Sequence, residues 1–162
     1  MDVHANISWE QYFMGVAMLS ANRSKDPNTK VGACIVNPDN KIVGIGYNGM
    51  PIGCDDVEMP WGRTGKSQLD TKYPYVVHSE LNAILNSIKD LKGCTMYVTL
   101  YPCNECAKAI IQSGITKVIY YENKYPDSDS VRASEMLFRV AKIPVEQYSR
   151  GVLRLSLSID IV

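Results

Sequence analysis

Residues 95–121 read TMYVTLYPCNECAKAIIQSGITKVIYY, and this stretch decides the fold class of the chain. Its two ends, residues 95–100 and 118–121, are predicted to be extended. Residues 103–113 between them are predicted to form a helix that ends at Gly114. The order of strand, helix and strand is typical of α/β proteins.

The same alternation continues on both sides of this stretch. Helices are predicted over residues 79–88 and 129–140, and a strand over residues 143–148. Upstream, the β-rich runs 31–37 and 42–47 flank a turn at 38–41, which predicts a hairpin. A hairpin followed by alternating helices and strands predicts a mixed sheet in an α/β layer.

The first helix is predicted from a capping box, in which Gln11 follows Ser8 by three residues. The segment Asp26-Pro27-Asn28 is expected to stop this helix. Apolar residues at helical spacing predict one buried face, made of Trp9, Tyr12, Phe13, Val16 and Leu19.

Two segments depart from this regular pattern. Residues 48–75 are rich in glycine and proline, which predicts an insertion that is either a functional flap or a disordered segment. Residues 152–162 alternate apolar and other residues at period two, which predicts a strand at a sheet edge or an interface. We find no internal repeat, and we expect residues 1–162 to form a single domain.

Composition excludes several classes of function. The 162 residues carry 17 basic and 17 acidic side chains, so polynucleotide binding through bulk charge is not expected. No apolar run approaches the roughly 20 residues of a membrane span, and residues 1–4 do not resemble a secretory signal. Five cysteines in such a chain favour a reducing compartment, so a cytoplasmic location is expected.

Two short motifs carry the chemistry. His78-Ser79-Glu80 and Pro102-Cys103-Asn104-Glu105-Cys106 each stand where a helix is predicted to begin. Two thiolates and one imidazole make three zinc ligands, which leaves the fourth position to water, as in catalytic zinc sites. Glu80 then lies near the metal as a proton carrier. The pattern H-x-E…P-C-x-x-C is the signature of zinc-dependent nucleobase deaminases.

Each motif alone also has a simpler interpretation. A lone C-x-x-C is more often half of a structural zinc site or a redox pair, and a lone histidine is more often a surface or core residue. The joint occurrence of the two motifs favours the catalytic interpretation.

The chain resembles the cytidine deaminase superfamily and, within it, the animal deoxycytidylate (dCMP) deaminases. The resemblance covers about residues 8–148; Ser79 departs from it, because alanine is usual there, and we expect little effect. The stretches that carry it are FMGVAMLSANRSKDPNTKVGACIVN, KIVGIGYNGMPIGC, DTKYPYVVHSELNAILN and KGCTMYVTLYPCNECAKAIIQSGI.

This resemblance implies a three-layer α/β/α fold with a mixed five-stranded sheet. It implies hydrolysis of dCMP to dUMP and ammonia for thymidylate synthesis, with one Zn²⁺ held by His78, Cys103 and Cys106 and with Glu80 as the proton carrier. It also implies activation by dCTP, inhibition by dTTP, Mg²⁺ bound with the effector, and a homohexamer.

Three further residues are candidates for substrate contacts. The resemblance implies that Arg23 reads the 5′-phosphate, that Asn48 contacts the sugar and that Tyr125 covers the substrate. The alternatives are a solvated basic helix end for Arg23, a turn residue for Asn48 and simple packing for Tyr125.

An effector site is expected around the strand end GIGYNGMP, at Gly44, Gly46, Tyr47, Gly49 and Met50. Asp55 or Asp56 could assist the cation there, although glycine at a hairpin end also needs no ligand. A second zinc near Cys54 is not favoured, because the segment has no histidine.

Other functions stay open at this point. The chain could deaminate another cytosine nucleotide or a nucleoside, or it could be a non-catalytic zinc-binding regulatory module. A polynucleotide editor is disfavoured by the zero net charge.

Overall fold

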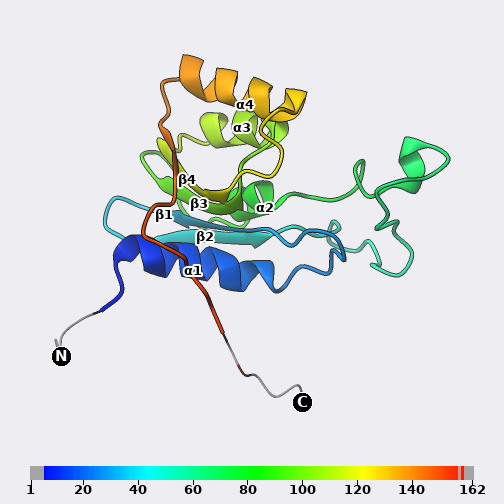
Figure 1. Cartoon of the computed structure of the whole chain (residues 1–162), viewed down its shortest axis with the longest axis horizontal. Coiled ribbons are helices and arrows are strands. Elements are labelled where there is room, and N and C mark those ends of the chain that lie inside the picture. The colour runs from blue at the N-terminus through cyan, green and yellow to red at the C-terminus, as the bar shows by residue number, and fades with distance from the viewer. Residues whose placement is uncertain (1–5, 157, 159–162) are drawn as a thin grey trace.

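The computed structural model describes residues 6–156 and residue 158 (Figure 1). Its five strands are β1 (Gly32–Val36), β2 (Ile42–Tyr47), β3 (Thr95–Leu100), β4 (Lys117–Glu122) and β5 (Val145–Gln147). They form one sheet in the order β2-β1-β3-β4-β5. β1 is antiparallel to β2 and β3, whereas β3, β4 and β5 are parallel, so the sheet is mixed as predicted.

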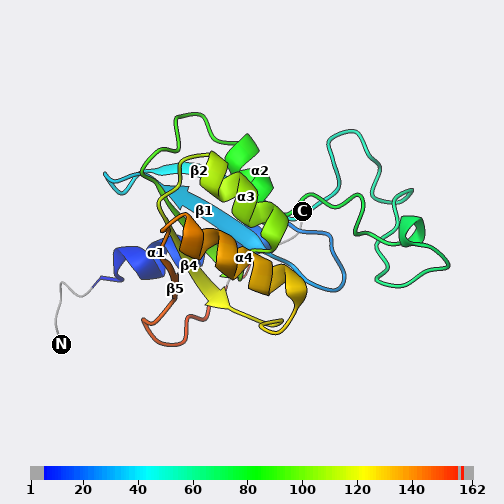
Figure 2. The same ribbon diagram turned by 90° about the horizontal axis from the view of Figure 1, so that it is seen from above.

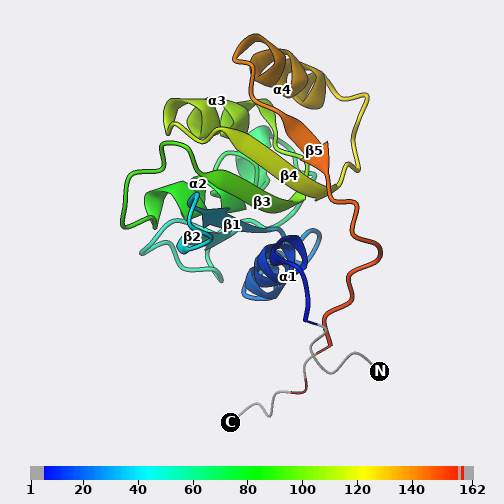
Figure 3. The same ribbon diagram turned by 90° about the vertical axis from the view of Figure 1, so that its left-hand side faces the viewer.

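The helices cover both faces of this sheet (Figure 3). Helix α1 (Trp9–Ala21) lies on one face, and α2 (Ser79–Leu85), α3 (Asn104–Gln112) and α4 (Asp129–Val140) lie on the other. Adjacent residues of the strands enter opposite cores, because successive side chains of a strand point to opposite faces. Ile35 and Met96 pack beneath α2–α4, whereas Cys34 and Tyr97 pack against α1. The three-layer α/β/α prediction is confirmed.

Helix α1 begins with the predicted capping box between Ser8 and Gln11. The face predicted for burial is only partly correct. Phe13 is buried and Val16 packs against the core, but Trp9, Tyr12 and Leu19 are exposed, and Trp9 keeps 57% of its surface accessible. The buried positions are Phe13, Met14, Ala17, Ser20 and Ala21.

The reason is the contact between α1 and β1. A Cβ atom on Gly32 would lie 1.9 Å from the carbonyl oxygen of Ala17, so the helix backbone rests directly on this glycine. The side of α1 that carries Ala17 and Ala21 therefore faces the sheet together with Phe13 and Met14, and Trp9, Tyr12 and Leu19 are turned outward.

The strand predicted over residues 152–162 is not present in the described part of that segment. Gly151 takes a left-handed φ of 81°. The chain then runs beside α1, where Arg150 Nε donates to Glu10 Oε2 at 2.7 Å and Leu153 approaches Gly15. Of the alternating apolar residues, Leu153 packs against the core beneath α1, whereas Leu155 is exposed. Residues 157 and 159–162 of the prediction lie outside the described residues.

The insertion 48–75 extends away from the sheet, and its only regular element among the described residues is the short 3₁₀ helix η1 (Gln68–Asp70) (Figures 1 and 2). Its ends meet where Gly49 and Val77 form an antiparallel bridge. No helix of the described chain is long and apolar enough to cross a membrane.

Candidate metal centre and its cavity

Three potential metal ligands converge at the beginnings of two neighbouring helices. His78 is the N-cap of α2, Cys103 is the N-cap of α3, and Cys106 lies in the first turn of α3. His78 Nδ1 lies 3.4 Å from Cys103 Sγ and 3.5 Å from Cys106 Sγ. All three ligand atoms lie within 4.8 Å of one another, so the two sequence motifs meet at one point.

This triangle fits a zinc ion. With Zn–S near 2.3 Å and Zn–N near 2.0–2.1 Å, tetrahedral ligands place N and S about 3.6 Å apart. The two observed N–S distances, 3.4 and 3.5 Å, are close to that value. Two thiols and one imidazole are also the donor set that zinc prefers, and three protein ligands leave one position for another group.

The three groups share protons through short contacts. The hydrogen bond with Cys106, followed by that with His78, lowers the pKa of Cys103 to about 4. The pKa of Cys106 is raised, first by the same hydrogen bond to Cys103 and then by burial. The contact with Cys103 raises the pKa of His78 to about 9. The cluster thus favours a thiolate beside a positive charge, and a bound cation would take the place of the shared protons.

Glu80 lies in the first turn of α2 and is only 4% exposed. Burial, together with the charge of Cys103, raises the pKa of its carboxyl group above the ordinary value. The hydroxyl of Ser79 donates to Glu80 Oε2 at 3.0 Å. Ser79 thus contacts the carboxylate, which its place in the sequence does not indicate, and its small effect on activity stays a prediction.

A cavity of about 430 Å³ opens over this centre. Its volume lies within the range of small-molecule sites. His78, Glu80 and Cys103 line it together with apolar side chains such as Val76 and Val131. Tyr125 also lines it and is half exposed, which places this ring at the rim.

Asn48 lines the same cavity, but its amide is engaged within the protein. Its Oδ1 accepts from the Val31 N–H at 2.8 Å, and its Nδ2 donates to the carbonyl of Thr29 at 2.9 Å. The same Nδ2 also donates to Asp26 Oδ2 at 3.3 Å. Asn48 is therefore buried and held in place, unlike a simple exposed turn residue.

Arg23 lies outside the lining of this cavity. It is exposed, and its guanidinium carbon lies 5.8 Å from the centre of the Tyr47 ring. The structure instead brings Asp26, Arg63 and Lys72 to the cavity, which sequence reasoning missed. Asp26 was interpreted only as a helix stop, and nothing local in the sequence indicates that Lys72 is its partner.

The residues expected at an effector site lie outside the cavity lining too. Gly44 and Gly46 are buried against α2, because a Cβ on Gly46 would lie 2.3 Å from the Ser79 carbonyl oxygen and from the Ala83 nitrogen. Close helix packing therefore explains these two glycines. Cys54 is exposed, and within the described chain only His78, Cys103 and Cys106 form a potential metal-binding group.

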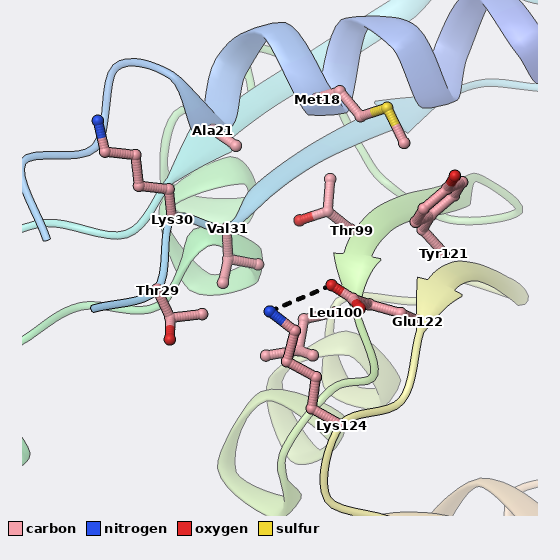
Figure 4. Close-up of a pocket in the computed structure, with 10 residues that line it drawn as sticks. All are labelled: Met18, Ala21, Thr29, Lys30, Val31, Thr99, Leu100, Tyr121, Glu122 and Lys124. Atoms are coloured by element: carbon pink, nitrogen blue, oxygen red, sulfur yellow. Dashed lines mark ion pairs between the residues drawn. The ribbon is translucent and has the colours of Figure 1, made fainter. Parts of the chain in front are cut away.

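A smaller cavity of about 210 Å³ adjoins the first and shares Thr29, Val31 and Leu100 with it (Figure 4). It lies between the end of α1 and the ends of β3 and β4. Lys124 Nζ forms an ion pair with Glu122 Oε1 at 3.2 Å in its wall.

Comparisons with known proteins agree with this site. The model of the cytidine and deoxycytidylate deaminase zinc-binding region matches residues 7–122. The chain is 62% identical over 143 residues to deoxycytidylate deaminase of Pongo abelii and 61% identical to that of Homo sapiens, in each case covering 88% of this chain and 80% of the relative. Among solved structures, dCMP deaminase from the cyanophage S-TIM5 in complex with dCMP and dUMP matches with a TM-score of 0.67 and 28% identity, over 90% of this chain and 100% of that one.

Proposed function

The chain belongs to the cytidine and deoxycytidylate deaminase family, and from this premise we propose that it hydrolyses dCMP to dUMP and ammonia. The observation that carries the proposal is the buried Glu80 beside the His78–Cys103–Cys106 cluster, at one cavity of nucleotide size. A structural zinc site needs neither the carboxylate nor the cavity.

His78, Cys103 and Cys106 would hold the zinc ion, which when bound supplies a Lewis acid that makes water a nucleophile at neutral pH. Glu80 takes a proton from the attacking water and gives it to ring nitrogen 3 while a bond forms from oxygen to carbon 4. Glu80 then moves the hydroxyl proton to the amino group. The bond from carbon 4 to nitrogen breaks, and ammonia leaves as the carbonyl of dUMP forms.

The cavity supports two of the predicted substrate contacts. Asn48 and Tyr125 both line it, the first buried and the second at the rim. Both Nδ2 hydrogens of Asn48 are used within the protein, so Asn48 would contact the sugar by accepting from a hydroxyl at the remaining lone pair of Oδ1. Tyr125 would cover the base. Arg23 stays a prediction as the reader of the 5′-phosphate.

The resemblance supports further proposals about regulation, assembly and cellular location. dCTP with Mg²⁺ would activate the enzyme and dTTP would inhibit it, through a site near Gly44–Met50. The chain would form a homohexamer, and the exposed aromatic side of α1 is the kind of apolar surface that assembly covers. It would supply dUMP for thymidylate synthesis in the cytoplasm, as one domain over residues 1–162.

Ammonia release from dCMP, dCTP, deoxycytidine and cytidine by the zinc-loaded protein tests the proposed function. We expect dCMP to have the highest kcat/KM. Faster turnover of another compound would identify a different cytosine deaminase. No release from any of them, with zinc bound, would indicate a non-catalytic module.

The variant Glu80→Gln tests the role of the carboxylate. Glutamine is nearly isosteric with glutamate but cannot carry the proton, so turnover should fall by about 10²–10⁴-fold. The zinc content measured by metal analysis should stay at one ion per chain. The matched control is Glu146→Gln, a solvent-facing carboxylate on β5 that is paired with Lys117, and it should keep full turnover. Unchanged turnover in a zinc-replete Glu80→Gln protein would remove Glu80 from the mechanism.

A further inference from the structure

Two cationic side chains other than the metal ligand His78 line the cavity, namely Arg63 and Lys72. Both come from the insertion 48–75, and they differ in what surrounds them. A substrate phosphate carries about two negative charges, so a cation that is free of a protein counter-ion is the better candidate to bind it.

The positive charge of Lys72 is already neutralised by Asp26. Its Nζ donates to Asp26 Oδ2, and the two side chains are 8% and 0% exposed. The backbone N–H groups of Asn28 and Thr29 also donate to Asp26, at 2.8 and 3.2 Å. The pair is a closed buried unit, and drawing Lys72 toward a ligand would leave a buried carboxylate without its cation.

Arg63 has no such partner. Its Nη2 donates to Thr29 Oγ1 at 2.7 Å, and no carboxylate in the described part of the chain lies within ion-pair distance of it. A guanidinium has five N–H donors. The bond to Thr29, another cavity residue, uses one of them and orients the group, so the others remain for an anion.

The two residues that precede Arg63 are held by hydrogen bonds to other parts of the chain. The Gly62 carbonyl accepts from the Lys72 N–H at 3.0 Å, and Asn28 Nδ2 donates to the Trp61 carbonyl at 3.2 Å. The Trp61 indole N–H donates in turn to the Asp56 carbonyl at 3.0 Å. The insertion thus delivers Arg63 to a defined position.

We propose that Arg63, rather than Arg23, binds the 5′-phosphate of the substrate and so makes the enzyme specific for nucleotides over nucleosides. This proposal rests on the proposed function, because it concerns the same cavity. A guanidinium forms charge-assisted, bidentate hydrogen bonds with phosphate, which a neutral 5′-hydroxyl does not offer. The insertion 48–75 would then select the substrate, because it supplies Arg63.

The test compares kcat/KM for dCMP with kcat/KM for deoxycytidine in Arg63→Ala, Arg63→Lys and Lys66→Ala. Hydrogen bonds to charged groups contribute about 1.5–3 kcal/mol, so the ratio of the dCMP value to the deoxycytidine value should fall about 10- to 100-fold in Arg63→Ala. The fall should come from a higher KM for dCMP. In Arg63→Lys the ratio should fall less, because lysine keeps the positive charge but cannot form two parallel hydrogen bonds with the phosphate. Lys66→Ala removes an exposed positive charge from the same insertion and should leave the ratio unchanged.

Binding gives a second measurement that does not depend on turnover. dUMP should raise the midpoint of thermal unfolding of the wild type more than deoxyuridine does, and Arg63→Ala should abolish that difference. An unchanged substrate ratio together with an unchanged dUMP effect would overturn the proposal. A selective loss in Arg23→Ala alone would assign the phosphate to Arg23. A wild type that binds dUMP but does not deaminate dCMP would instead overturn the proposed function.

Discussion

At the scale of single residues, Asp26 holds together three parts of the chain that are distant in sequence. It contacts Lys72 at the end of the insertion and Asn48 after β2, besides the backbone of its own turn. Burial by itself raises the pKa of this carboxyl group, but the hydrogen bonds from Lys72 and from the N–H groups of Asn28 and Thr29 outweigh it. The net result is a pKa below the ordinary value.

This depressed pKa predicts a pH dependence of stability. The ionised form is favoured in the folded state, so the stabilisation is complete above the unfolded pKa of about 3.9 and is lost as pH falls through the folded value. Asp26→Asn should lower the free energy of unfolding at pH 7 by about 3–5 kcal/mol, because Lys72 is left buried without its partner. It should also flatten the loss of stability below about pH 4.

Denaturant unfolding between pH 3 and 7 measures both effects. Asp39→Asn changes an exposed carboxylate in the turn between β1 and β2 and should give the wild-type curve. If Asp26→Asn also gives the wild-type curve, the ion pair between Asp26 and Lys72 does not stabilise the fold as described above.

At the scale of elements, the site depends on how closely α2 approaches β2. The beginning of α2 carries His78 and Glu80, and the helix backbone lies directly over Gly44 and Gly46. Any side chain at these two strand positions would lift the helix and move both functional groups relative to α3.

Gly46→Ala tests this dependence. The added Cβ would lie 2.3 Å from two backbone atoms of α2, which cannot move away as a side chain would. Such overpacking should cost about 1–3 kcal/mol of unfolding free energy or more. Turnover of dCMP should fall about 10- to 100-fold, because small displacements of catalytic groups are costly.

Gly49→Ala is the matched control, since the nearest atom to its Cβ would be a Tyr47 ring carbon at 3.9 Å. It should retain the stability of the wild type. Should Gly46→Ala keep full stability and lose only its response to dCTP, the effector interpretation of this glycine would be favoured over the packing one.

At the scale of the whole molecule, the exposed side of α1 leaves large apolar residues in solvent. Trp9, Tyr12 and Leu19 lie on that side, and only Trp9 and Tyr12 interact with neighbouring aromatic rings. The proposed homohexamer would give this surface a partner. It would also allow effectors to act by changing the balance between two states of the assembly.

Effector control predicts sigmoidal dCMP kinetics that become hyperbolic with dCTP and Mg²⁺. A coupling free energy of about 1–3 kcal/mol would change the apparent dCMP affinity roughly 5- to 150-fold. Initial rates with and without each effector, together with sedimentation to measure the mass of the assembly, check this. Hyperbolic kinetics with no dCTP effect, and purely competitive dTTP inhibition, would show that effectors act only at the cavity.

The sequence by itself determined the features that depend on near neighbours. The bounds of β3 and α4, the capping box of α1 and the meeting of His78 with Cys103 and Cys106 were all predictable. Caps and periodicities act over three or four residues. The potential metal ligands stand at the beginnings of α2 and α3, which lie on the same face of the sheet, so the fold class already favours their meeting.

The tertiary structure alone decided which residues meet across long separations. Asp26 pairs with Lys72 across 46 residues, and Arg63 reaches Thr29 across 34. Such pairs depend on where a loop returns to the fold, which no local pattern encodes. The buried side of α1 was likewise decided by its contact with Gly32, and Leu153 packs beside that helix rather than in a strand. Periodicity shows that a face is apolar, but only packing determines which surface covers it.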